Sequence, residues 1–259
     1  MTNVIVPLNA FERLEVLKNG QVSFIKLIAQ SGAFGVEIRR ELLPEKNLQL
    51  DMIKSEIQKF GLFTVYSAPI ELWREDSSLN KEVLSKVFNE ANVLGAKWLK
   101  VCLGHYEKVK SSMKDLKNFA NDHHEIQLLI ENDQTQYGGN VKHLKEFFES
   151  VTQNEIRVYM TFDAGNWLYT NQDAEFALRE LAPYVVYLHL KQVENQCGEL
   201  VTIPLHNGGN TFWKKAFAEL PINIVKALEF PIEPKEKTAE YISFIKELAK
   251  ESEEVPCKS

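Results

Sequence analysis

Four stretches between residues 126 and 229 share one form: a mostly apolar run that ends on a side chain able to bind a metal ion. They are residues 126–131 (IQLLIE), 158–163 (VYMTFD), 185–189 (VVYLH) and 224–229 (IVKALE). An apolar run of this length, bounded by turn residues, is typical of a strand buried on both faces. A carboxylate at the end of such a strand is costly to bury alone, so it needs a cation or another partner. The repetition therefore favours a fold in which the ends of several buried strands meet.

The same strand-then-helix unit occurs eight times, at a spacing of about 30 residues. Strands are expected at residues 3–8, 35–42, 62–67, 98–103, 126–131, 158–163, 185–189 and 224–229, and helices at 22–31, 49–60, 80–94, 108–122, 140–152, 171–181, 211–219 and 237–252. Eight such units close into a (β/α)₈ TIM barrel, an α/β fold whose sites lie at the C-terminal strand ends. A doubly wound open sheet is the competing arrangement, but no glycine-rich phosphate loop follows the first strand.

The expected organisation is a single domain over residues 1–259, with a charged and frayed tail at about 251–259. Residues 68–74 are expected to form a polar and aromatic connection after the third strand. Residues 195–209 are long for a strand-to-helix connection and predict a hairpin around Gly198.

Composition narrows the classes of protein. The net charge of −6 disfavours nucleic acid as the main partner, since phosphate binding usually requires a basic face. Three cysteines without CxxC spacing fit a reducing compartment. No signal peptide is visible and no run approaches the length of a membrane span. We therefore expect a cytoplasmic protein with no membrane partner; homo-oligomer formation stays open.

The four strand-end residues predict one metal site. In a barrel, the side chains of Glu131, Asp163, His189 and Glu229 lie on consecutive strands and can converge on one side of the C-terminal rim. Three carboxylates and one imidazole suit one divalent cation, Mn²⁺, Mg²⁺, Co²⁺ or Zn²⁺. Carboxylates this close repel one another unless a cation lies between them.

The strand-end motifs LLIENDQT, TFDAGNW, YLHLKQ and ALEFPIE resemble those of the xylose-isomerase-like TIM barrel superfamily of sugar isomerases and epimerases. The resemblance covers essentially the whole chain. SAPIELWRE and LIENDQTQYGG resemble the branch of epimerases of ketogluconate utilisation. The resemblance implies that Glu131 and Glu229 bind the metal and also form the proton-transfer pair, on opposite sides of the substrate carbon. It further implies that Asn166 contacts a substrate hydroxyl.

One departure from the superfamily pattern follows Lys191. Many relatives carry an Asp close to this lysine, whereas here the next residue is Gln192. The exchange removes a carboxylate and disfavours a second metal ion.

Further substrate-binding candidates surround the strand ends. Glu37 and Arg39 alternate at the end of the second strand and either bind a sugar hydroxyl or acid group or simply pair with each other at the rim. Glu71 is expected to contribute a polar wall over the site. Lys191 lies two residues after His189 on the same strand face, which places it near the site.

The predicted activity is a metal-dependent sugar or sugar-acid epimerase or isomerase, acting by proton transfer through an enediolate. A proton α to a carbonyl is removable near neutral pH only if the developing charge is stabilised, and a cation does that. Two bases invert a stereocentre, while one base that moves a proton between carbons interconverts aldose and ketose. The alternatives are a metallo-endonuclease of the apurinic-site type, a polyol dehydratase on the same barrel, and a ligand-binding barrel without catalysis.

Overall fold

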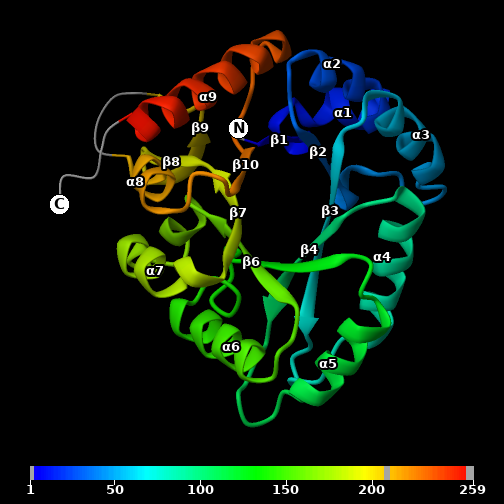
Figure 1. The fold of residues 1–259 in the computed structure, drawn as a ribbon, viewed down its shortest axis with the longest axis vertical. Coiled ribbons are helices and arrows are strands. Elements are labelled where there is room, and N and C mark those ends of the chain that lie inside the picture. Colours follow the sequence, from blue (N-terminus) through cyan, green and yellow to red (C-terminus); the bar gives the residue numbers. More distant parts are fainter. Residues whose placement is uncertain (1–2, 207–210, 255–259) are drawn as a thin grey trace.

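The chain folds into a closed barrel of eight parallel strands surrounded by helices (Figure 1). The computed structural model describes residues 3–206 and 211–254. The barrel order is β1-β10-β7-β6-β5-β4-β3-β2, which confirms the predicted (β/α)₈ TIM barrel as a single domain. Its strands are β1 (Val4–Pro7), β2 (Gly35–Arg39), β3 (Phe63–Trp73), β4 (Trp98–Gly104), β5 (Gln127–Glu131), β6 (Val158–Asp163), β7 (Val185–Leu190) and β10 (Val225–Leu228).

The helices follow the expected periodicity, with one addition. They are α1 (Arg13–Asn19), α2 (Ile25–Gln30), α3 (Leu50–Phe60), α4 (Lys81–Leu94), α5 (Met113–Asp122), α6 (Val141–Gln153), α7 (Ala174–Leu181), α8 (Phe212–Glu219) and α9 (Thr238–Glu254). Helix α1 was not predicted from the sequence. Its Leu14 and Leu17 are exposed, while Val16 is buried. A helix without a repeated buried face carries no amphipathic signal. None of the described helices is both long and apolar enough to cross a membrane.

Strand β3 is longer than predicted. The expectation that residues 68–74 form a connection was wrong, because the strand continues to Trp73 after a register shift between Ser67 and Glu71. Pro69 lies inside this shift. Proline lacks an N–H for the hydrogen bonds between strands and is confined to edges and irregularities of sheets. Its presence therefore led to the prediction of a loop where the structure has a bulged strand.

The expected hairpin is present between β7 and α8. It pairs β8 (Gln192–Gln196) with β9 (Glu199–Ile203) in antiparallel register. Gly198 has φ +95°, a conformation that favours glycine. Of the predicted insertion 195–209, residues 207–209 lie outside the described part of the chain, as do residues 255–259 of the predicted tail.

The barrel interior separates into an apolar layer and a polar layer above it. Alternate residues of a strand point to the same face. Leu129, Tyr187 and Ala227 belong to one buried cluster inside the barrel. Two residues further along the same three strands lie Glu131, His189 and Glu229. The apolar layer therefore forms a floor beneath the strand-end side chains.

A buried ionic cluster on the outside of the barrel yields a prediction about stability. The Tyr66 hydroxyl donates to Glu90 Oε2 at 2.7 Å, and Arg40 donates to both oxygens of the same carboxylate at 2.6 and 3.0 Å. Because a hydrogen bond to a charged group contributes about 1.5–3 kcal/mol, Tyr66→Phe should lower the free energy of unfolding by that amount. Denaturant titration checks this, with Tyr159→Phe as the control because Tyr159 is exposed on β6. Equal losses in both variants would contradict the role of the Tyr66 hydroxyl.

Candidate metal centre

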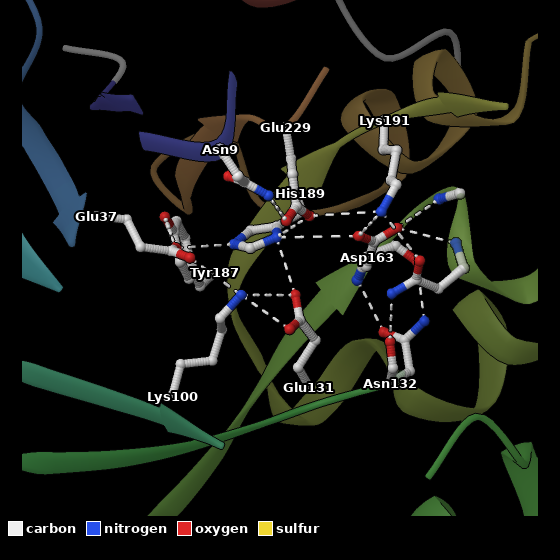
Figure 2. A network of polar contacts seen from close by, with 12 residues as sticks. Asn9, Glu37, Lys100, Glu131, Asn132, Asp163, Tyr187, His189, Lys191 and Glu229 are labelled. Atoms are coloured by element: carbon white, nitrogen blue, oxygen red, sulfur yellow. Dashed lines mark hydrogen bonds and ion pairs between the residues drawn. The ribbon is translucent and has the colours of Figure 1, made fainter. Parts of the chain in front are cut away.

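Four side chains converge at the C-terminal ends of strands β5, β6, β7 and β10 (Figure 2). Glu131 and Asp163 are the last residues of β5 and β6, His189 is the last but one of β7, and Glu229 directly follows β10. One ligand atom from each residue lies within 4.8 Å of all the others. The parallel register places Asp163 beside His189. The predicted convergence of this quartet is thus present in the fold.

The imidazole of His189 faces the three carboxylates through one nitrogen. Its Nδ1 lies 2.6 Å from Glu229 Oε2, 2.9 Å from Glu131 Oε1 and 4.0 Å from Asp163 Oδ2. Its Nε2 lies 3.2 Å from Glu37 Oε2, on the opposite side of the ring. The His189 side chain is fully buried, so both ring nitrogens interact only with protein groups.

Backbone amides orient the carboxylate of Asp163. Oδ1 accepts hydrogen bonds from the backbone N–H groups of Gly165 and Asn166 at 2.8 and 2.9 Å. The Asn132 side chain bonds both the N–H and the carbonyl of Asp163 and thereby clamps β6 to the end of β5. Oδ2 is left facing the other ligands and Lys191, whose Nζ is 3.3 Å away.

Three cations surround the carboxylates. Lys100 contacts both oxygens of Glu131, at 2.9 and 2.8 Å, and Arg39 donates to Glu229 Oε1 at 3.1 Å. Lys191 contacts Asp163 and lies 3.9 Å from Glu229 Oε2. Each of the three cations therefore offsets charge on a different carboxylate of the quartet.

The protonation equilibria show where negative charge is in excess. Burial, with added repulsion from Glu229, raises the pKa of Asp163 to about 7 despite the attraction of Lys191. For Glu229, burial acts to raise the pKa, but Lys191, His189 and Lys100 hold it well below its ordinary value. A carboxyl group that titrates this high among other carboxylates is a position where a cation would be stabilised. The donor set of three carboxylates and one imidazole fits a divalent cation.

The predicted substrate-binding residues divide into two groups. Glu37, Arg39, Asn166 and Lys191 all belong to the polar network around the quartet; Lys191 donates to Asn166 Oδ1 at 3.1 Å. Glu71 lies apart at the rim, on the strand that pairs with β4, where its Oε2 lies 3.9 Å from His105 Nε2. The structure therefore does not bring Glu71 into contact with the quartet.

Four members of the network were not predicted from the sequence: Asn9, Lys100, Asn132 and Tyr187. Asn9 donates to Glu229 Oε1 at 2.9 Å, and Tyr187 donates to Glu37 Oε2 at 2.8 Å. Only Lys100 left a signal, because a single lysine inside the apolar run Trp98–Gly104 must have a buried partner. Asn9 and Tyr187 lie far from their partners in the sequence.

Comparison with known proteins agrees with this architecture. A family model described as "Xylose isomerase-like TIM barrel" matches residues 25–248. No curated protein matches the sequence significantly.

Solved structures of similar fold cover nearly the whole chain. A xylose isomerase domain containing protein from Salmonella typhimurium has a TM-score of 0.70 and 16% identity, covering 96% of this chain and 97% of its own. The IolI protein with a binding zinc atom has a TM-score of 0.66 and 16% identity, covering 97% and 98%. The 3-keto-D-glucoside 4-epimerase from E. coli has a TM-score of 0.63 and 13% identity, covering 95% and 100%. At these identities the likeness shows the fold.

Proposed function

The chain belongs to the xylose isomerase-like TIM barrel family, and from that premise we propose that it is a divalent-metal-dependent epimerase or isomerase of a sugar or sugar acid. One observation carries the proposal: ligand atoms of Glu131, Asp163, His189 and Glu229 lie within 4.8 Å of one another at the barrel rim. Barrel sites of this fold lie at the C-terminal strand ends. The zinc bound by IolI and the sugar chemistry of the E. coli epimerase support the proposal.

Proton transfer is the step that this arrangement suits. A bound cation would supply the positive charge that stabilises oxygen anions next to the carbon that loses its proton. Glu131 and Glu229 approach His189 from below and above in the view of Figure 2. Burial alone would raise the pKa of Glu131, but Lys100 and His189 lower it, so the group is ionised and able to accept a proton. We assign the two glutamates to proton transfer.

The surrounding donors suit a polyhydroxylated or acidic substrate. Arg39 and Lys191 keep 12% and 11% of their side chains exposed beside the ligands. Asn166 is positioned by Lys191 and by Gln134, which donates to Asn166 Oδ1 at 3.1 Å. We assign Arg39 and Lys191 to hydroxyl or carboxylate groups of the substrate, and the Asn166 Nδ2 hydrogen that does not bond the Asn132 carbonyl to a substrate hydroxyl. Glu71, at the rim, would contact only a substrate that extends toward β3.

Hydrogen exchange with solvent tests the proposal. Protein stripped by a chelator is reloaded with Mn²⁺, Mg²⁺, Co²⁺ or Zn²⁺, and thermal unfolding identifies the ions that raise the melting temperature. The loaded protein is then incubated in D₂O with ketoses, keto-sugars and sugar acids. We expect deuterium at the carbon next to the carbonyl, together with an epimer or isomer, and neither in the chelated control.

Other outcomes would redirect the assignment. Loss of water from a polyol substrate without an epimer would indicate a dehydratase. Cleavage of DNA at apurinic sites would indicate the nuclease alternative. A protein whose melting temperature responds to none of these ions, and which exchanges no substrate proton, would refute the proposed function.

A further inference from the structure

Glu37 is a buried carboxylate beside the Nε2 atom of the His189 imidazole. Its side chain is 0% exposed and accepts contacts from four protein groups (Figure 2). Oε2 accepts from the Tyr187 hydroxyl at 2.8 Å and contacts His189 Nε2 at 3.2 Å. Oε1 accepts from Arg39 at 2.8 Å and lies 3.1 Å from Lys100 Nζ. Both oxygens are engaged by protein donors, and of the two alternatives left open by the sequence the pairing of Glu37 with Arg39 is present.

The contact with His189 determines which ring nitrogen can bind a metal. A neutral imidazole carries its proton on one nitrogen and a lone pair on the other. The Nδ1 atom faces the three carboxylates of the quartet, whereas Nε2 faces a fourth carboxylate, that of Glu37. Arg39 and Lys100 can only donate to the other oxygen, so the carboxylate faces Nε2 as an acceptor and holds the proton there.

We propose that Glu37 is a positioning residue of the metal centre, which accepts the Nε2 proton of His189 and so keeps the Nδ1 lone pair aimed at the cation. Metal-binding histidines commonly donate their second N–H to a carboxylate, and loss of such a partner typically weakens metal affinity by 10- to 100-fold. The inference rests on the proposed metal centre. It goes beyond that proposal by giving a residue outside the quartet a defined task.

The substitution Glu37→Gln reverses the hydrogen-bond polarity at Nε2. Arg39 and Lys100 can only donate, so the carboxamide oxygen must face them. The carboxamide NH₂ group then faces His189 Nε2 and the Tyr187 hydroxyl. A donor placed against Nε2 favours the tautomer with the proton on Nδ1, the atom that must bind the metal. We expect the dissociation constant for Mn²⁺ or Zn²⁺ to rise by about 10- to 100-fold.

Tyr187→Phe is the matched control. Tyr187 bonds the same Glu37 oxygen from an equally buried position, and its ring packs edge-on against His189 at 4.6 Å. Phenylalanine keeps that ring contact and leaves the carboxylate on Nε2. We therefore expect near-normal metal affinity in this variant. If Glu37 only filled space or balanced charge, the two variants would weaken binding alike.

Titration of metal into both variants, followed by calorimetry, gives the affinities, and ¹⁵N NMR of the Zn²⁺-loaded protein gives the position of the proton. We expect the unaltered protein to carry the His189 proton on Nε2. This measurement needs no variant, so it also decides the matter if Glu37→Gln does not fold. Unchanged affinity in Glu37→Gln, or a His189 proton on Nδ1 in the loaded protein, would overturn the inference. Failure of the unaltered protein to bind any of these ions would count against the proposed function instead.

Discussion

Asp163→Asn is expected to lower the affinity for the divalent cation roughly 100-fold. Four-ligand zinc sites have apparent binding free energies of about 10–16 kcal/mol, which averages to about 3 kcal/mol for each ligand. Asparagine is as damaging here as a truncation, because the amides of Gly165 and Asn166 require an acceptor at the Oδ1 position. The carboxamide NH₂ is then forced into the Oδ2 position. It places a donor where the cation needs a ligand oxygen.

Asp173→Asn provides the matched control for this result. The Asp173 carboxylate also accepts two backbone N–H bonds, from Glu175 and Phe176, at the start of α7. It is exposed and lies outside the quartet. Calorimetric titration with Mn²⁺ should give an unchanged affinity for this variant. Circular dichroism should show that both variants keep the barrel, because strand-end residues lie above the apolar core. Normal affinity in Asp163→Asn would remove Asp163 from the ligand set.

Replacing Glu131 or Glu229 with glutamine is expected to reduce turnover by about 10²- to 10⁴-fold, the loss typical of removing a general base. Glutamine keeps the shape of the side chain and one of its two oxygens. Glu229 Oε1 accepts from Asn9 and Arg39, and Glu131 is bonded by Lys100. In Glu229→Gln these donors hold the carboxamide oxygen at the Oε1 position and turn the NH₂ group toward His189, so weaker metal binding is expected beside the loss of the base. Activity is measured at saturating Mn²⁺ to separate lost chemistry from weakened metal binding.

Deuterium incorporation from D₂O distinguishes the roles of the two glutamates. With two bases on opposite sides of the substrate carbon, exchange should persist in at most one variant. With a single base, deuterium exchange and product formation should stop together in the variant that lacks that base. Glu125→Gln is the control, since Glu125 is exposed shortly before β5 and lies outside the site. Exchange at the unaltered rate in both site variants would leave the metal centre intact but exclude the two glutamates from the chemistry.

Much of the architecture could be predicted from local sequence pattern. Apolar runs of strand length and helical spacing of buried residues depend on neighbours along the chain, so they survive without tertiary information. The failures have local causes. The second half of β3 was not predicted because Pro69 indicates a loop. Helix α1 was not predicted because its Leu14 and Leu17 are exposed, which leaves it without an apolar face.

The convergence of the quartet could also be predicted, because each member directly ends an apolar run. Its supporting residues could not. Glu37 contacts His189 across 152 residues, and Asn9 reaches Glu229 across 220. These contacts exist because β1 pairs with β10 and closes the barrel.

By itself, the sequence determined the repeated strand-and-helix units, the barrel that eight of them form, and the four side chains that converge at the strand ends. Only the tertiary structure decided what surrounds these side chains: Lys100 on Glu131, Arg39 and Asn9 on Glu229, and Glu37 beside His189. The tertiary structure also places Glu71 at the rim, away from the quartet. The physical reason is that secondary structure follows from periodicity along the chain. Side-chain partners depend instead on the register in which distant strands pair, and on the side of the barrel wall to which each residue points.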